Sequence, residues 1–363
     1  MKKKLTALAV TAALAPVAAM AGTHDITISS NVSIYGRADL SVDKMSGVAA
    51  DTNKTSVSSN SSRFGVKGSH DIGGGMTGMF QIESGVNLAG SQVRDGNGPV
   101  TSGQVFSRAR DMFIGLGGNF GAIKVGRMGG ANQWVYDSNL FADQLGDTGN
   151  FTGEIAGFGG RLDGILMYET PNMNGFNAAL TYIPARSLDA APATGNSSYG
   201  AKFDYANSGF GAHLAHFNVS TTTAAVETEN KNTSIAGSYD FGNGMVTAQY
   251  VNFKVDTAGA ASTTRKVYNI GGKFNVSDNG AIKVQYSNAD DLTGTPNSGA
   301  NMIAIGYDHK LSDAMAAYVV YARTDNDTGA AFTVNRYGHG GDAGGAAAGE
   351  DPKGLSIGLG YNF

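Results

Sequence analysis

The feature that most constrains the fold is an alternation of apolar and polar residues that recurs along almost the whole chain. In residues 32–42 the even positions are Val, Ile, Gly, Ala, Leu and Val, whereas the odd positions are Ser, Tyr, Arg, Asp and Ser. A period of two indicates a β-strand with one apolar face. The run is also long enough to cross a bilayer as a tilted strand, which takes about 9–11 residues.

Two kinds of connection separate these runs, and they alternate strictly. Short connections rich in Gly and Asn lie at 71–75, 117–121, 172–175, 207–209, 242–244, 278–280 and 310–313. Long polar connections lie at 43–61, 87–104, 129–163, 184–197, 220–232, 255–265, 289–300 and 324–354. Seven short turns and eight long loops separate 16 strands. An even number of strands, with short turns on one rim and long loops on the other, is typical of a bacterial outer-membrane barrel.

The composition agrees with strands that are apolar on one face only. Of 363 residues 53 are Gly, and 41% are hydrophobic, yet no stretch after the N-terminus has the 18 or more apolar residues of a membrane helix. Only 15% of residues are charged, against about a quarter in ordinary soluble domains. The absence of Cys excludes disulfides, thiolate nucleophiles and Cys-ligated metal sites.

The N-terminus predicts export. Three lysines at 2–4 precede an apolar core at 5–15 and an Ala-Met-Ala cleavage site at 19–21, which together define a signal peptide over 1–21 and a mature chain from Gly22. A short membrane anchor is the alternative, but the apolar run is too short for one. Without those three lysines, the 26 basic residues become 23 against 30 acidic residues. A mildly acidic chain with no basic patch argues against nucleic acid as a partner.

Alternation by itself does not separate a membrane barrel from a secreted β-sandwich or β-solenoid. Two features favour the barrel. The apolar faces consist largely of small residues and end in Tyr or Phe, as in the aromatic girdles at membrane interfaces. The chain also ends in register, with Ile357, Leu359, Tyr361 and Phe363 on one face and no polar tail. We therefore predict an all-β fold, a 16-stranded antiparallel transmembrane β-barrel that occupies residues 22–363 as one domain.

Short motifs, by their order and spacing along the chain, resemble the general, trimeric porins of Gram-negative bacteria in their 16-stranded form. They are SIYGR at 33–37, NSSRFGVKG at 60–68, FQIE at 80–83, FIGL at 113–116, FGAIKVGR at 120–127, YETP at 168–171, Gly175-Phe176 and the terminal Phe363. The resemblance implies an outer-membrane channel for passive diffusion of ions and small hydrophilic solutes. It also implies a homotrimer in the lipid bilayer, and a C-terminal strand whose Tyr361 and Phe363 are read by the barrel assembly machinery.

In this family the third long loop folds into the barrel and narrows the pore, and residues 129–163 fit that position. The resemblance then implies a constriction with an acidic side and a basic wall. Its acidic side would be Glu83, Asp137, Asp143, Asp147 and Glu154, and its basic wall would be Arg37, Arg63, Arg127 and Arg161. Lys67, Arg108, Arg110 and Lys124 are further lumen candidates. Acids and bases nearly balance, so the sequence does not predict whether anions or cations are preferred.

Alternation places Arg37 and Arg63 on the polar face independently of any resemblance, but it does not do so for Arg127. Strict alternation from Ile123 and Val125 points Arg127 outward and Lys124 inward. An arginine on the lipid face at mid-depth costs about 2–4 kcal/mol. We therefore expect either a bulge at Gly126 that turns Arg127 into the lumen or a position beyond the apolar band.

Other function classes find little support in the sequence. Six His are present, but no G-x-S-x-G elbow occurs, and His213 and His216 fall on opposite strand faces, which argues against a shared metal. We thus predict neither an enzyme nor a cofactor. An adhesin or surface receptor is the alternative, because the 324–354 loop is rich in Gly and Ala from 338 to 349. Such a loop reads most simply as flexible external cover.

Overall fold

The computed structural model describes residues 31–47, 54–89, 94–95, 98–99, 108–129, 138–153, 160–185, 197–223, 226–340 and 346–363. The predicted signal peptide lies outside these ranges. The strands are β1 (Asn31–Ser46), β2 (Lys54–Ser59), β3 (Arg63–Gly73), β4 (Met76–Gly85), β5 (Arg94–Asp95), β6 (Gly98–Pro99), β7 (Arg108–Gly118), β8 (Gly121–Gly129), β9 (Arg161–Glu169), β10 (Phe176–Ile183), β11 (Ser198–Asn207), β12 (Phe210–Thr223), β13 (Val226–Asp240), β14 (Gly244–Thr257), β15 (Thr263–Asn275), β16 (Gly280–Ala289), β17 (Ala300–Lys310), β18 (Met315–Asn326) and β19 (Lys353–Asn362). One short helix, α3 (Gly149–Thr152), is described. None of the described helices is long and apolar enough to cross a membrane.

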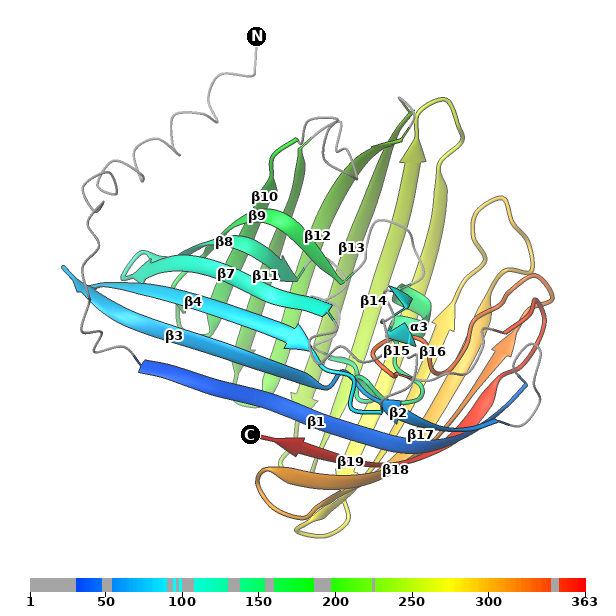
Figure 1. Cartoon of the computed structure of the whole chain (residues 1–363). Coiled ribbons are helices and arrows are strands. Elements are labelled where there is room, and N and C mark those ends of the chain that lie inside the picture. Colours follow the sequence, from blue (N-terminus) through cyan, green and yellow to red (C-terminus); the bar gives the residue numbers. More distant parts are fainter. Residues whose placement is uncertain are drawn as a thin grey trace. The chain divides into compact units, whose positions relative to one another are not determined.

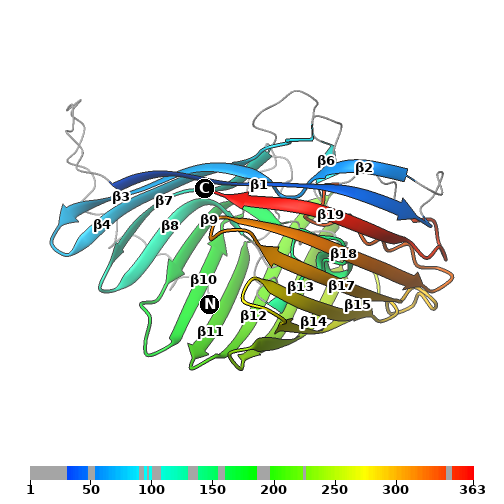
Figure 2. The ribbon, with the colours of Figure 1, turned by 90° about the horizontal axis from the view of Figure 1, so that it is seen from below.

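The strands form one closed antiparallel barrel (Figures 1 and 2). Each strand pairs with its neighbours in the chain, and β1 closes the sheet by pairing with β19, with Leu40 opposite Leu359. Both β2 and β3 pair with β1, so they are two parts of one strand interrupted at 60–62. The barrel therefore has 16 strand positions, as predicted, and the small β5–β6 hairpin is separate from it.

The alternation of the sequence separates the two faces of the barrel. On the outer face apolar side chains are exposed, for example Ile34 at 64%, Ile114 at 70% and Ile270 at 61%. The alternate residues point inward, where many are polar, such as Ser41 and Gln285. Closure leaves no sheet edge unpaired, which is the condition for a sheet in lipid. The predicted apolar-out and polar-in pattern is confirmed.

The predicted short turns are confirmed, but several predicted long loops are shorter than expected. The region 220–232 was expected to be a loop, whereas β12 continues to Thr223 and β13 starts at Val226. The two strands pair residue by residue along this extension. Thr is favoured in strands, and four of the residues in this run are Thr, so the sheet extends beyond the span that the membrane alone requires.

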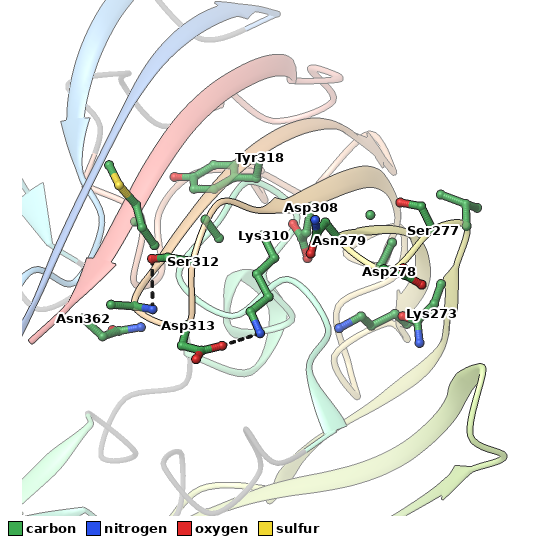
Figure 3. Close-up of a pocket in the computed structure, with 18 of the residues that line it drawn as sticks. Lys273, Ser277, Asp278, Asn279, Asp308, Lys310, Ser312, Asp313, Tyr318 and Asn362 are labelled. Atoms are coloured by element: carbon green, nitrogen blue, oxygen red, sulfur yellow. Dashed lines mark hydrogen bonds and ion pairs between the residues drawn. The ribbon is translucent and has the colours of Figure 1, made fainter.

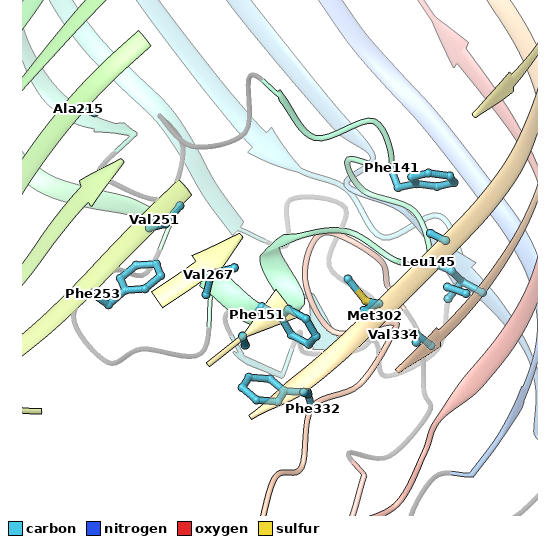
Figure 4. Close-up of a cluster of buried hydrophobic side chains, with 14 of the residues drawn as sticks. Phe141, Leu145, Phe151, Ala215, Val251, Phe253, Val267, Met302, Phe332 and Val334 are labelled. Carbon is cyan, nitrogen blue, oxygen red and sulfur yellow. The ribbon is translucent and has the colours of Figure 1, made fainter. Parts of the chain in front are cut away.

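Two segments far apart in the chain pack together inside the barrel. We call residues 138–153 the inner loop and residues 330–340 the returning segment. Phe141, Leu145 and Phe151 of the inner loop are fully buried, as are Phe332 and Val334 of the returning segment (Figure 4). The expectation that this part of the last loop is flexible external cover is therefore wrong. Its alternating Ala330, Phe332 and Val334 supply apolar side chains that are buried in one cluster with the inner loop and the barrel wall.

Candidate functional site

The inner loop lies against the inner wall of the barrel and is joined to the returning segment. Asn150 Oδ1 accepts hydrogen bonds from the backbone N–H groups of Arg336, at 2.8 Å, and Tyr337, at 3.3 Å. The N–H of Gly146 donates to the carbonyl of Val334 at 2.9 Å. The rings of Phe151 and Phe332 meet edge to face, 4.8 Å apart. These contacts fix the inner loop within the lumen, as the prediction for residues 129–163 requires.

Arg37 and Arg63 stand side by side on the inner wall. They are directly opposite each other in the pairing of β1 with β3. Arg37 donates to Asp39 and also to Asp143 of the inner loop, where Nη1 and Oδ2 are 3.3 Å apart. Among the ion pairs recorded for the described residues, none involves Arg63. Arg37 is thus joined to the inner loop by an ion pair, whereas Arg63 adds a positive charge beside it.

The carboxylate of Asp39 fixes the position of Arg37. Asp39 is 1% exposed, and its Oδ1 accepts hydrogen bonds from Tyr318 Oη at 2.8 Å and Asn60 Nδ2 at 3.3 Å. Asn60 in turn accepts from the N–H of Gly340 in the returning segment, at 3.2 Å. The guanidinium of Arg37 is therefore held by a buried network that extends to the returning segment.

Arg110 and Arg161 add two more basic groups on the neighbouring strands. Arg110 pairs with Glu83. Arg161 pairs with Asp111, with Nε and Oδ1 2.7 Å apart, and its Nη2 is 4.0 Å from Glu83. Glu83, which also accepts from Tyr35 Oη at 2.9 Å, thus lies among the basic groups rather than on an opposite acidic side. The register shift between Ile82 and Ser84 accommodates this cluster.

Arg127 does not join this cluster. A register shift does occur between Gly126 and Met128 in the pairing of β8 with β9, but the extra residue lies in β9, at 163–164, and β8 pairs regularly with β7 through Gly126, so the bulge is not at Gly126 as predicted. Arg127 lies opposite Met112, on the face that carries the exposed Ile114, and pairs with Asp163 at 2.6 Å. The bulge gives Arg127 a carboxylate partner on the outer face instead of turning it inward, and the expectation of an inward Arg127 is wrong.

The predicted acids of the inner loop have different environments. Asp143 faces Arg37, as expected. Asp147 is fully buried within the loop, where its carboxylate accepts from the N–H of Asp143 at 2.8 Å, the N–H of Gly149 at 2.6 Å and Asn139 Nδ2 at 2.6 Å. Burial, followed by the charge of Asp143, raises the pKa of Asp147 to about 8 despite these donors. Asp147 therefore shapes the loop rather than lining the lumen as predicted.

The remaining predicted lumen residues are distributed as follows. Asp137 and Glu154 lie outside the described residues, as does the side chain of Arg108. Lys67 lies on the inner face with its ammonium group 5.0 Å from the ring centre of Tyr35. Lys124 points inward, where it pairs with Glu169 at 2.6 Å.

Water-accessible cavities extend from the basic cluster to the rim of short turns. One cavity of about 860 Å³ has Arg37 and Asp39 in its lining and reaches Lys273, Lys310 and Asp313 near the turns (Figure 3). A second, of about 630 Å³, is lined by Asp111, Lys124, Glu169, Lys202 and Asp204, among others. Their linings carry charges of both signs, which suits a wet passage for hydrophilic solutes.

Sequence reasoning missed several residues of this site. Asp39 shares the inward face with Arg37 two positions away, so alternation could have identified it as a partner. Asp111 could not be found in this way, because the bulge opposite Glu83 alters the register. Within the described ranges, no three His, Asp or Glu side chains are grouped closely enough to hold a metal ion.

Known proteins place these features in a family. A family model described as Gram-negative porin matches residues 5–329. The chain is 31% identical to outer membrane porin protein 32 of Delftia acidovorans over the full length of both. The chain belongs to the Gram-negative porin family. Major outer membrane protein P.IB of Neisseria gonorrhoeae is 33% identical over 59% of this porin and 56% of its own length.

Solved structures agree with the fold. An anion-selective porin from Comamonas acidovorans is 25% identical, covers 92% of this chain and 100% of its own, and superposes with a TM-score of 0.79. OmpT of Vibrio cholerae, in a trimer form, is 15% identical and shares the fold at a TM-score of 0.67, with 92% and 99% of the two chains covered. This porin is an outer-membrane channel through which small hydrophilic solutes diffuse passively.

Proposed function

We propose that this porin prefers anions and that Arg37, Arg63, Arg110 and Arg161 form the basic side of its constriction. The observation that carries the proposal is the direct juxtaposition of Arg37 and Arg63. Like charges opposite each other on paired strands are unfavourable. We infer that the barrel retains this pair because the combined positive potential of the two guanidinium groups attracts a permeating anion.

The acidic groups near these arginines are largely held in ion pairs, whereas Arg63 is absent from the ion pairs recorded for the described residues. Asp39 pairs with Arg37, Glu83 with Arg110 and Asp111 with Arg161, and burial raises the pKa of Asp147 to about 8. Asp143 therefore remains as the inner-loop acid that faces the arginines among the described residues. The relative from Comamonas acidovorans, whose title describes an anion-selective porin, gives this assignment independent support.

The mechanism is electrostatic sorting without tight binding. Fixed charges raise the local concentration of one ion sign over about a Debye length, roughly 10 Å at 0.1 M salt. Passage also requires that each ion leave easily, so a row of weak sites is better than one pocket. Arginine suits this role because its guanidinium stays charged at all relevant pH values.

The zero-current potential of the purified protein in a planar bilayer under a KCl gradient tests the preference. We expect the sign that belongs to chloride permeation, with a magnitude that decreases in concentrated salt. A potential of the potassium sign would contradict the proposal. Release of sugars from liposomes at rates that fall with solute size would separately support open diffusion rather than an adhesin role.

We further propose a homotrimer in which the wall from β1 to β9 faces the neighbouring subunits. Exposed tyrosines mark the long-loop ends of strands on the rest of the barrel: Tyr182, Tyr199, Tyr268, Tyr286 and Tyr321. In contrast, the exposed large apolar side chains described between 31 and 129 are aliphatic, with Phe120 in a turn as the exception. Aromatic girdles mark lipid–water interfaces. A sector that lacks exposed tyrosines at the long-loop ends of its strands is therefore suited to contact with protein rather than lipid.

Two matched isoleucines test this assignment. Ile114 is 70% exposed on the β1–β9 wall and Ile235 is 54% exposed on the opposite sector. Ile114→Arg should abolish the trimer band of unboiled samples in a detergent gel while the monomeric barrel persists. Ile235→Arg, which would face lipid, should reduce membrane insertion without changing the trimer fraction of what inserts. The reverse pattern would place the contact elsewhere.

Export and assembly complete the proposal. Residues 1–21 would be removed on export, and the barrel would insert into lipid with the help of the barrel assembly machinery. Tyr361 and Phe363 are stacked on the outer face, with ring centres 6.1 Å apart, and the backbone of Phe363 pairs with Gly36 across the closing seam. The relatives are channels, and we propose no enzymatic activity for this chain.

A further inference from the structure

One glutamine on the barrel wall contacts four residues of the inner loop. Gln285 lies on the inner face of β16 and is 1% exposed. Its Oε1 accepts from the N–H of Leu140 at 2.9 Å. Its Nε2 lies within hydrogen-bonding distance of Asn139 Oδ1, Gly146 O and Thr148 Oγ1, at 3.3, 3.2 and 3.1 Å.

These contacts reach both ends of one turn of the inner loop. Residues 139 and 140 begin the turn, and residues 146 and 148 end it, so a single side chain holds the two ends together. Inside the turn the carboxylate of Asp147 accepts from the N–H of Asp143. Asp143 has a φ of +63°, in the left-handed region that is uncommon for residues other than Gly but that Asp adopts more readily than most. The carboxylate of Asp143 then reaches Arg37.

We infer that Gln285 is the positioning residue of the constriction: it fixes the turn that presents Asp143 to the arginines. This inference rests on the proposed role of those arginines. None of the recorded contacts between Gln285 and the inner loop is to Asp143. Gln285 acts through the backbone of the turn, because a buried amide in contact with four loop residues would lose hydrogen bonds if the turn moved.

The wall around Gln285 is shaped for close contact with the loop. Gly146 has a φ of +80°, and a Cβ there would overlap the Cβ of Ala304 on β17. The loop backbone therefore lies flat on the wall at that point. Lys283, two residues before Gln285 on the same face, donates to Gln144 Oε1 at 2.6 Å. Lys283 secures a neighbouring loop residue, whereas Gln285 contacts both ends of the turn from the barrel wall. Within the loop the same two ends are joined by the hydrogen bond from Asn139 Nδ2 to Asp147.

Gln285→Met tests the inference, because Met has a similar length and no hydrogen-bonding amide. Gln81→Met is the matched control, since Gln81 lies in the second cavity on β4 and has no recorded contact with the inner loop. A spin label on Ala142→Cys reports motion of the turn, and the Cys-free chain needs no other change. Both variants are studied as full-length protein in liposomes and planar bilayers.

We expect Gln285→Met to increase the mobility of the label, the open-channel noise and the single-channel conductance, whereas Gln81→Met leaves the mobility of the label as in the wild type. An equally immobile label and unchanged conductance in Gln285→Met would overturn the inference. If that variant does not assemble, Thr148→Val removes one contact from the loop side and should increase mobility in the same direction. An unchanged label in Thr148→Val would then count against the inference.

The positioning role of Gln285 and the proposed anion preference can be contradicted separately. A mobile label in Gln285→Met supports the positioning role whichever ion the wild type prefers. A cation preference in the wild type contradicts the proposed function and leaves the label measurement standing as a test of position alone.

Discussion

Replacing Arg63 with Gln should shift the ion preference toward cations by a calculable amount. Arg63 faces the lumen beside Arg37 and is absent from the ion pairs recorded for the described residues. Its removal therefore takes away a positive charge without leaving an unpaired carboxylate behind. The substitution also relieves the repulsion between two arginines that lie opposite each other, so the barrel itself should not be destabilised.

The size of the shift follows from Coulomb's law with screening. An ion that passes about 6 Å from the guanidinium interacts with it by about 0.7 kcal/mol in a water-like medium. A Debye length of about 10 Å at 0.1 M salt reduces this energy to about 0.4 kcal/mol. The anion loses this energy and the cation gains it, so the permeability ratio should change about fourfold. At 1 M salt, where the Debye length is about 3 Å, the change should fall to about 1.4-fold.

Zero-current potentials of the two proteins at low and high salt give the measurement. Arg127→Gln is the control, because it makes the same chemical change on the outer face and should leave the potential unaltered. A potential in Arg63→Gln equal to the wild type at 0.1 M would refute the reasoning. So would a shift of the same size at both salt concentrations, because a screened field cannot produce it.

Three further predictions concern the interior segments and the terminus. Burial raises the pKa of Asp147 to about 8, so its carboxyl group is neutral below that pH and ionised above it. The anion preference should therefore fall as pH rises from about 7 to 9, and in Asp147→Asn the zero-current potential should not change with pH over this range. Phe332→Ala removes a buried ring and should cost about 3–5 kcal/mol, which would speed hydrogen exchange of the 330–340 amides about 100-fold or more; exchange as slow as in the wild type would show that the ring does not hold the segment. Phe363→Ser should reduce the amount of folded trimer in the outer membrane without changing the total exported, as fractionation can measure; a normal trimer yield would remove Phe363 from the assembly signal.

The barrel could be predicted because the sequence patterns that specify its strands and turns are local. Each strand shows its two faces through alternation, and a short Gly- or Asn-rich connection marks each hairpin turn. The extent of β12 and β13 could not be read in this way, because Thr and Asn fit an external loop as well as a strand beyond the membrane. The pairing of the two strands settles the matter, and pairing is a property of two segments at once.

The interior of the site was harder to predict for a related reason. Alternation placed Arg37 and Arg63 correctly on the inner face, because the direction of each side chain depends only on the strand that carries it. The burial of Phe332 depends on Phe151, and the carboxylate of Asp147 is turned inward by donors within its own loop. Arg127 shows a third limit, because a bulge changes the register and its carboxylate partner comes from the next strand.

The juxtaposition of Arg37 and Arg63 breaks a rule that the rest of the barrel follows, and such exceptions are expected where function sets the sequence. The positive charge of Arg37 is paired with the carboxylate of Asp39, which itself accepts hydrogen bonds from Tyr318 and Asn60. No comparable network surrounds Arg63 among the described residues. If stability were the only requirement, a neutral residue at position 63 would serve as well. This difference between two neighbouring arginines supports the proposed role of Arg63, in which its charge acts on passing ions.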